Sequence, residues 1–301
     1  MEKYAPNKME LASRDVVSRA EQTEINEGRG FEDGTVALDI TVVPKKRVHE
    51  ALREIVLVGR DFAGVDITRE PIHIKPGNHY TMGGIKTDVD GRTDIPGLYS
   101  AGETACVSVH GGNRLGANSL LDTLIFGKRS GRDAAARAKR NDYARPSKKV
   151  LEDEENLVAD LMSREKGAGR RISEIKLELG QTMDSKVAVF RDETGIQEAL
   201  EIVKRLKEEA KTAYIDDHGS VFNQDLLAAI ELGYMLDNAE CTCVAALERK
   251  ESRGAQYRTD FPERNDEDWL KHINVSANGS EPEISYSKVT MTRWEPEERK
   301  Y

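Results

Sequence analysis

Hydrophobic residues recur at helical spacing along much of the chain, which predicts a protein built mainly of helices. In its first part, the pattern predicts helices over 9–27 and 45–59, ended by Gly28 and Gly59. Between these helices, apolar and polar residues alternate over 36–42, as on one face of a β-strand. The first part of the chain is therefore expected to combine helices with a small sheet.

A second pattern, over residues 98–122, predicts a strand, a turn, a polar loop and the start of a helix. Leu98, Tyr99 and Ala101 suit a buried parallel strand, and Gly102 permits a tight turn after it. Glu103 would then lie at the carboxyl end of the strand, where open α/β sheets bind their ligands. Before this stretch, residues 88–94 carry the signal of a hairpin turn.

The loop leads into a predicted helix at 119–140, for which Asn118 or Ser119 is a suitable N-cap. The free backbone N–H groups at such a helix start favour negative charge on a bound ligand. Residues 141–149 have the composition of a linker.

From residue 150 onward the pattern is almost entirely helical up to residue 253. The helices have apolar positions at heptad-like spacing and charged outer faces, and the connectors between them are short. Short connectors predict antiparallel neighbours, so this part is expected to form a helical bundle. Its predicted helices are 150–164, 170–183, 193–211 and 224–252, and a final strand is predicted near 283–291.

Composition narrows the class of protein. The chain has 301 residues, 33% of them charged, and a formal net charge of −9, which argues against a nucleic-acid partner. It has no apolar run long enough to span a membrane and no recognisable signal segment at its start. Cys106, Cys241 and Cys243 are odd in number and suit a reducing compartment. In a helix, residues two apart point in different directions, so no metal site is expected at Cys241 and Cys243.

Two sequence segments are more specific than any of these patterns. Gly97-Leu-Tyr-Ser-Ala-Gly-Glu103 and Ser108-Val-His-Gly-Gly-Asn-Arg-Leu-Gly-Ala-Asn-Ser-Leu-Leu-Asp122 closely resemble the second FAD-binding segment of the succinate dehydrogenase/fumarate reductase flavoprotein subunit. Residues 251–270 resemble the C-terminal signature of the same family, and the resemblance runs in family order from Tyr4 to the last strand. From the residues alone, the alternative is a generic strand-turn-helix with a surface arginine.

The resemblance assigns roles to residues around the loop. It implies that Glu103 binds the FAD ribose, and that Asn118, Ser119 and Leu120 lie at the isoalloxazine end of the cofactor. It also implies that Arg114 binds a substrate carboxylate.

Two earlier segments also match family motifs. His79-Tyr-Thr-Met-Gly-Gly84 resembles the segment whose histidine binds a substrate carboxylate. Ala12-Ser-Arg-Asp-Val-Val-Ser-Arg19 resembles the segment with the catalytic arginine, a role that falls on Arg14. By chemistry alone, Arg14 and Arg19 would more often be solvated or paired with Asp15.

Two other histidines, His73 and His110, match no family role. They are expected to serve structural purposes.

The resemblance implies an α+β fold in several parts. Residues 1–76 would form part of a capping domain, and 77–140 the second segment of an FAD-binding α/β domain. An antiparallel helical bundle at 146–253 and a short C-terminal β tail at 254–301 would follow. The family subunit is about twice this length, and its first half carries a G-x-G-x-x-G fingerprint that these 301 residues lack. The chain is therefore expected to be the C-terminal half of such a subunit.

The implied function is oxidation of succinate to fumarate, with hydride transfer to FAD. Electrons would pass on to an iron–sulfur subunit and a quinone, with membrane anchor subunits holding the assembly at the cytoplasmic side of a membrane. One alternative is an L-aspartate oxidase-like flavoenzyme, which shares the His-Gly-x-Asn-Arg-Leu pattern. The long bundle and the Asp-Glu-Asp-Trp269 tail favour the dehydrogenase. The other alternative is a flavin-free truncated protein without activity.

Overall fold

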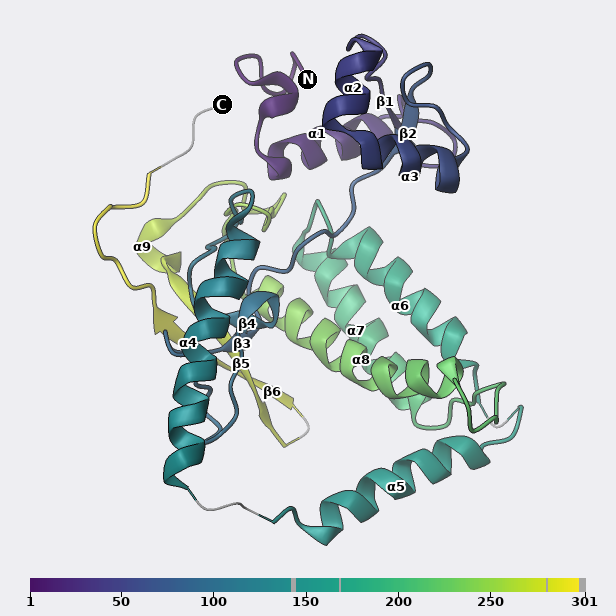
Figure 1. The fold of residues 1–301 in the computed structure, drawn as a ribbon, viewed down its shortest axis with the longest axis vertical. Helices are drawn as coiled ribbons and strands as arrows, with labels where there is room; N and C mark the ends of the chain where they lie inside the picture. The colour runs from purple at the N-terminus through teal and green to yellow at the C-terminus, as the bar shows by residue number, and fades with distance from the viewer. Residues whose placement is uncertain (142–144, 168, 280, 298–301) are drawn as a thin grey trace. The chain divides into compact units, whose positions relative to one another are not determined.

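The computed structural model describes residues 1–141, 145–167, 169–279 and 281–297 (Figure 1). The chain forms two compact units, Met1–His79 with Pro296–Tyr301, and Tyr80–Glu295. Each unit is described by itself. Among the described residues, no helix combines the length and apolar character needed to cross a membrane.

The first unit packs short helices around a small antiparallel sheet. Its strands β1 (Val36–Leu38) and β2 (Ile72–Ile74) pair with Val36 opposite Ile74. Its buried apolar residues are few and mostly small: Ala5, Ala12, Ala20, Val48 and Ile67. The helices are η1 (Met9–Leu11), α1 (Arg14–Asn26), α2 (Lys45–Ala51) and α3 (Arg53–Ala63).

Two predictions in this unit were wrong in detail. The helix predicted at 45–59 breaks at Leu52 into α2 and α3, and it ends at Gly64 in the left-handed conformation (φ +70°). Gly59 instead lies inside α3, where an added Cβ would come within 3.0 Å of Ile67 Cγ2. The strand predicted at 36–42 stops at Leu38, because the Asp39 carboxylate accepts the N–H of Thr41 (2.8 Å) and turns the chain.

The second unit begins with a small parallel pairing and a long helix. Strand β3 (Ile85–Lys86) pairs in parallel with β4 (Ala105–Cys106), which follows the short helix η2 (Gly102–Thr104). The loop after β4 leads to α4 (Asn118–Arg140), the long helix labelled in Figure 1. At Gly84 (φ +113°) a Cβ would lie 2.5 Å from the Thr104 carbonyl oxygen, so only glycine lets the two segments meet.

The buried strand predicted at 98–101 is absent. Tyr99 forms an isolated antiparallel bridge with Arg92, and the side chain of Leu98 is 46% exposed. The expected hairpin turn is present, because Gly91 (φ +74°) donates its N–H to the Asp88 carbonyl (3.0 Å). The chain therefore folds back locally at 88–100, and parallel pairing begins only at β4.

Helices α6 (Ile172–Lys186), α7 (Glu193–Ala210) and α8 (Gln224–Glu248) form the bundle, side by side in Figure 1. Helix α7 runs antiparallel to α6, since the N–H of Ile172 bonds to the carbonyl of Tyr214 just after α7 (3.2 Å). The three helices enclose the main apolar core: Ile172, Ile175, Leu179, Val203, Leu206, Ala213, Ile215, Leu232, Leu236 and Ala239.

Helix α5 (Lys148–Ser163) was predicted to be a bundle member, and this is wrong for most of its length. Residues 148–160 are exposed, and only Leu161 is buried at the end near the bundle. Its apolar stripe includes Val150 and Leu151, which are 60% and 61% exposed. The periodicity predicted the helix correctly, but a packing partner for its apolar face is a matter of tertiary structure.

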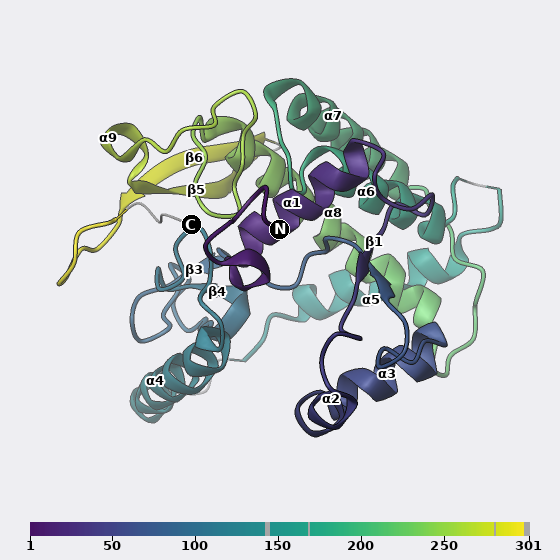
Figure 2. The ribbon, with the colours of Figure 1, turned by 90° about the horizontal axis from the view of Figure 1, so that it is seen from above.

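The second unit ends in a β-hairpin. Short helix α9 (Asp266–Trp269) precedes strands β5 (Lys271–Asn278) and β6 (Glu281–Lys288), which pair in antiparallel register (Figure 2). The predicted final strand corresponds to β6, whereas β5 was missed. Together with the bundle, the described helices and small sheets give the mixed helix-and-sheet fold that was expected.

Candidate functional site

The loop between β4 and α4 presents an arginine on an aromatic ring. The guanidinium carbon of Arg114 lies 4.6 Å from the centroid of the Tyr80 ring, within the range of a cation–π contact. Its Nη1 donates to the carbonyl of Leu115 (3.2 Å), while its Nε is buried without a hydrogen-bond partner among the described residues. The guanidinium is thus held in place and retains donor capacity for an anion.

The ring under Arg114 is itself held by a histidine and a buried carboxylate. The Tyr80 hydroxyl lies 3.1 Å from His110 Nε2 and 3.4 Å from Asp122 Oδ2, and His110 Nε2 lies 3.0 Å from the same carboxylate oxygen. Burial, then the charge of Asp122, raises the pKa of Tyr80, so the phenol stays protonated and can donate. Asp122 lies on α4 and is only 3% exposed.

This arginine cluster (Tyr80, His110, Arg114 and Asp122) contains unusual unpaired atoms. Besides Arg114 Nε, His110 Nδ1 and Asp122 Oδ1 are buried without a hydrogen-bond partner among the described residues. Buried polar atoms normally find partners, because leaving one unpaired costs roughly 1–3 kcal/mol. Three such atoms in one cluster are typical of a place where a ligand, water or further protein completes the pairing.

The cluster was only partly predicted from the sequence. Arg114 was a predicted site residue, but His110 was expected to be structural, and neither Tyr80 nor Asp122 was assigned a role. All four stand inside the quoted family-like segments, which was the available signal. Their contacts join residues 30 and 42 positions apart, and no local periodicity encodes such contacts.

The start of α4 differs from the prediction. Its N-cap is Ala117 in the left-handed region (φ +65°), and neither Asn118 nor Ser119 caps it. The N–H groups of Asn118 and Leu120 bond to carbonyls within the loop (3.2 and 3.1 Å). Among the hydrogen bonds of the described residues, the N–H of Ser119 takes part in none. The helix start therefore offers a ligand fewer donors than a regular N-terminus does.

Glu103 lies in η2 with an exposed carboxylate. Its Oε1 accepts the backbone N–H of Thr81 (2.9 Å), which ties η2 to the segment just before Gly83 and Gly84. The second unit thus holds Glu103, Arg114 and the start of α4 on neighbouring segments, joined by β3–β4 pairing and by packing of α4 on η2.

The other two predicted site residues belong to the first unit. Arg14 is the exposed first residue of α1, and Asp15 pairs with Arg19 (3.2 Å). His79 is an exposed loop residue at the end of that unit.

His73, expected to be structural, is occupied by local contacts. Its ring stacks on that of Phe31, with centroids 4.0 Å apart. Its Nδ1 lies within hydrogen-bond distance of Thr35 Oγ1 (3.1 Å) and Asp33 Oδ2 (3.2 Å).

The cysteines lie in different environments. Cys243 is buried in the bundle, 3.9 Å from the Met183 sulfur, and burial raises its pKa to about 11. Cys241 is exposed, and Cys106 is partly buried in β4. Within the part of the chain that is described, no three His, Cys, Asp or Glu side chains are grouped to hold a metal ion.

Comparison with known proteins identifies two family models along the chain. Residues 2–120 match a model described as an FAD binding domain. Residues 176–301 match one described as the C-terminal part of the fumarate reductase flavoprotein.

Relatives of known name match nearly the whole chain. The succinate dehydrogenase flavoprotein subunit of Rickettsia conorii is 40% identical over 307 residues, covering 97% of this chain and 51% of the relative. The fumarate reductase flavoprotein subunit of Mycobacterium tuberculosis is 40% identical over 303 residues, covering 97% and 52%. A solved E. coli quinol fumarate reductase chain superimposes with a TM-score of 0.89 at 36% identity, covering 96% of this chain and 51% of that one. The chain spans about half the length of the curated relatives it matches.

The residues near β3, β4 and α4 fit an FAD cofactor. Gly84 and Gly102 have positive φ, and because they carry no side chain, a ligand can approach the backbone closely beside the strands. The first turns of α4 expose apolar side chains that suit the flat face of a flavin or covering protein: Leu120, Leu121, Leu124 and Ile125. The exposed carboxylate of Glu103 suits hydroxyl groups, so polar and apolar groups are both present for such a ligand.

Proposed function

The chain is a partial flavoprotein of the succinate dehydrogenase/fumarate reductase family, and we propose that it supplies part of an active site that interconverts succinate and fumarate. The observation that carries this proposal is the Arg114 guanidinium, held on the Tyr80 ring with a buried, unpartnered Nε at the loop before α4. The 40% identity to named flavoprotein subunits over 97% of the chain supports the same reaction.

We assign one substrate carboxylate to Arg114. A guanidinium offers donors in a planar fork that matches a carboxylate, and this geometry fixes the orientation of the bound acid. Because Arg114 is already held against Tyr80, its side chain loses less conformational entropy when a carboxylate binds.

The second carboxylate is assigned to His79, and the proton to Arg14. His79 has two ring nitrogens, one of which can donate to an anion. A guanidinium is a cation with N–H donors, so Arg14 would donate a proton in the fumarate-reducing direction. Orientation of a substrate by binding groups can contribute up to about 7–11 kcal/mol of the barrier reduction.

FAD, when bound, supplies the hydride acceptor or donor of the reaction. We propose that the exposed carboxylate of Glu103 binds its ribose, and that Asn118, Ser119 and Leu120 lie at the ring end. The unused N–H of Ser119 would then face the ring system, where it favours partial negative charge.

The finer domain plan and the partners are part of the same proposal. Residues 1–76 would act as part of a capping domain and 77–140 as the second FAD-binding segment. The bundle of α6–α8 and the tail at 254–301 would complete the chain's share of the subunit. An iron–sulfur subunit would receive the electrons, and membrane anchor subunits would hold the assembly peripherally at the cytoplasmic side.

The test is an absorbance spectrum of the chain after incubation with FAD and gel filtration. A flavin band that elutes with the protein and bleaches anaerobically on adding succinate supports the proposal. Arg114→Ala should weaken the response to succinate by roughly 10- to 100-fold, because charge-assisted hydrogen bonds are lost. Arg140→Ala, at the far end of α4, is the matched control and should change little.

Other outcomes would overturn the assignment. Bleaching by L-aspartate and not succinate would indicate an L-aspartate oxidase-like enzyme. A colourless protein peak, even when the N-terminal half of a matched relative is supplied as a second polypeptide, would indicate a flavin-free protein.

A further inference from the structure

The loop that carries His110 and Arg114 packs backbone to backbone on a distant turn. The N–H of Ala255 donates to the carbonyl of Gly112 (2.8 Å). A Cβ on Gly112 would lie 2.7 Å from the Arg253 carbonyl oxygen, and a Cβ on Gly254 would overlap the Gly112 carbonyl. The contact therefore requires glycine on both sides, at positions about 140 residues apart in the sequence.

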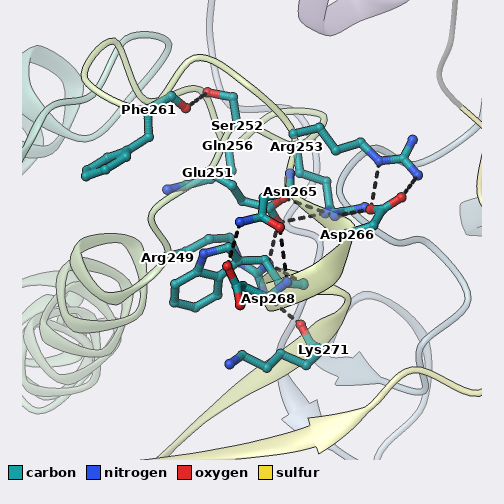
Figure 3. A network of polar contacts seen from close by, with 12 residues as sticks. Arg249, Glu251, Ser252, Arg253, Gln256, Phe261, Asn265, Asp266, Asp268 and Lys271 are labelled. Atoms are coloured by element: carbon teal, nitrogen blue, oxygen red, sulfur yellow. Dashed lines mark hydrogen bonds and ion pairs between the residues drawn. The ribbon is translucent and has the colours of Figure 1, made fainter.

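The turn at 253–256 is fixed by its own hydrogen bonds and by charges. Arg253 and Gln256 exchange backbone hydrogen bonds (2.7 and 3.2 Å). The Arg253 side chain donates Nε and Nη2 to the two carboxylate oxygens of Glu251 (2.7 and 3.0 Å) and Nη2 to Asp266 (2.5 Å). Figure 3 shows Arg253 among these partners.

Glu251 is the centre of this polar network. It is fully buried, and it also accepts Arg249 Nη1 (2.7 Å) and the backbone N–H of Asn265 (2.9 Å). Arg249 in turn donates to the carbonyl of Lys271 at the start of β5 (2.7 Å), as Figure 3 shows. A buried carboxylate with this many partners is held in one geometry, because each displacement would leave a buried charge unpaired.

A second tether joins the same loop to β5. Ser108 Oγ lies 2.7 Å from His272 Nε2, the residue after Lys271. Ser108 has a positive φ (+72°), which an L-residue keeps only when its surroundings impose it. The stretch from Ser108 to Arg114 is thus held by the C-terminal segment near its start and at its middle.

We propose that Glu251 and Arg253 are positioning residues for Arg114. The network around Glu251 sets the turn at 253–256, and the backbone of that turn fixes Gly112, two residues before Arg114. The loop thereby presents the guanidinium in one place for a dicarboxylate. The ligand named here rests on the proposed function, whereas the mechanical coupling does not.

The first test is Gly254→Ala, read by hydrogen–deuterium exchange of peptides from the chain without FAD or dicarboxylate. The added Cβ pushes on the Gly112 carbonyl, so exchange in the peptide at 107–115 should rise about tenfold. Exchange in α6 and α7 should stay unchanged. The control is Gly233→Ala in α8, where a Cβ meets nothing within 4 Å, and it should leave both regions unchanged.

The second test is Glu251→Gln, which keeps the shape and removes the charge. The same local rise at 107–115 is expected, with α6 and α7 still protected. A purely structural role would instead lower the melting temperature and raise exchange evenly across the unit. If Glu251→Gln does not fold, Arg253→Gln is read in the same way, because it removes the other charge of the pair. An unchanged loop in folded Gly254→Ala protein, or an equal rise in α6 and α7, would overturn the proposal without bearing on flavin binding.

Discussion

The bundle of α6–α8 and the α4 segment (residues 80–140) belong to the same unit, but they differ in how fully each buries its own apolar side chains. The bundle encloses its own core, in which Val203 and Leu206 are fully buried. The α4 segment has two-residue strands, and Leu120 and Leu124 on its helix are each 68% exposed. Stability thus resides mainly in the bundle, whereas the proposed chemistry resides in the segment with the least core of its own.

The difference has a physical cause. Helices that follow one another along the chain bury their apolar faces through short connections, so a bundle can be completed locally. A parallel strand pair needs further strands and a covering layer to become stable. The exposed apolar face of α4 is therefore expected to contact cofactor or additional protein.

The largest change in the free energy of unfolding is expected when a core side chain of the bundle is truncated. Leu206→Ala removes a fully buried side chain and leaves a cavity, so the free energy of unfolding should fall by about 2–5 kcal/mol. Urea denaturation followed by circular dichroism measures this change. A loss well under about 1 kcal/mol would mean that the bundle core is not the main source of stability.

Thiol reactivity should distinguish the two regions next. Burial raises the pKa of Cys243 to about 11, so it should carry about 100-fold less thiolate than a thiol with the ordinary value of 9.0. A thiol reagent should therefore modify partly buried Cys106 of the α4 segment long before Cys243 of the bundle. Cys241 is exposed but also lies on α8, so the comparison of the two regions rests on Cys106 and Cys243. Mass spectrometry of the modified peptides gives the order, and early labelling of Cys243 would show that the bundle opens readily.

Alanine-to-glycine changes should alter the stability of the chain by a smaller amount, with opposite signs in the two regions. Ala117→Gly relieves a left-handed backbone at the start of α4 and should stabilise the chain by about 0.5–1 kcal/mol. Ala228→Gly, inside α8, should destabilise it by about 1 kcal/mol. Thermal melts of the two variants measure both signs, and a destabilised Ala117→Gly protein would contradict the strained loop.

The smallest change in the free energy of unfolding is expected for the exposed apolar side chains of α4. Leu124→Ala removes a side chain that is 68% exposed, so the free energy of unfolding should change by less than about 0.5 kcal/mol. A loss comparable to that of Leu206→Ala, in the same urea experiment, would show that this face is covered in the isolated chain.

The sequence predicts the bundle better than it predicts the α4 segment. Helix α7 was predicted at 193–211 and spans Glu193–Ala210, because amphipathic spacing and the Asp192 N-cap (2.7 Å to the Gly195 N–H) are local signals. The strand expected at 98–101 was wrong, since strand pairing depends on segments elsewhere in the chain. Helix α5 has the right periodicity, but its residues 148–160 are exposed in the described part of the chain.

The candidate site shows the same limit. Glu103 and Arg114 were found because they stand in long family-like segments, and their roles remain predictions. The ring under Arg114 and the carboxylate behind it emerge only when the chain folds Tyr80 onto α4. The backbone contact between Gly254 and Gly112 joins residues still further apart in the sequence, and no periodic pattern predicts it.

The most direct test of the account is hydrogen–deuterium exchange of the whole chain with and without millimolar FAD, a concentration that also reveals weak binding. Bound FAD should slow exchange in peptides covering residues 83–86, 102–106 and 118–125, with α6, α7 and α8 unchanged. Unchanged exchange in all three of those stretches, or protection in the bundle in their place, would contradict the claim that the α4 segment carries the flavin-holding part of the protein.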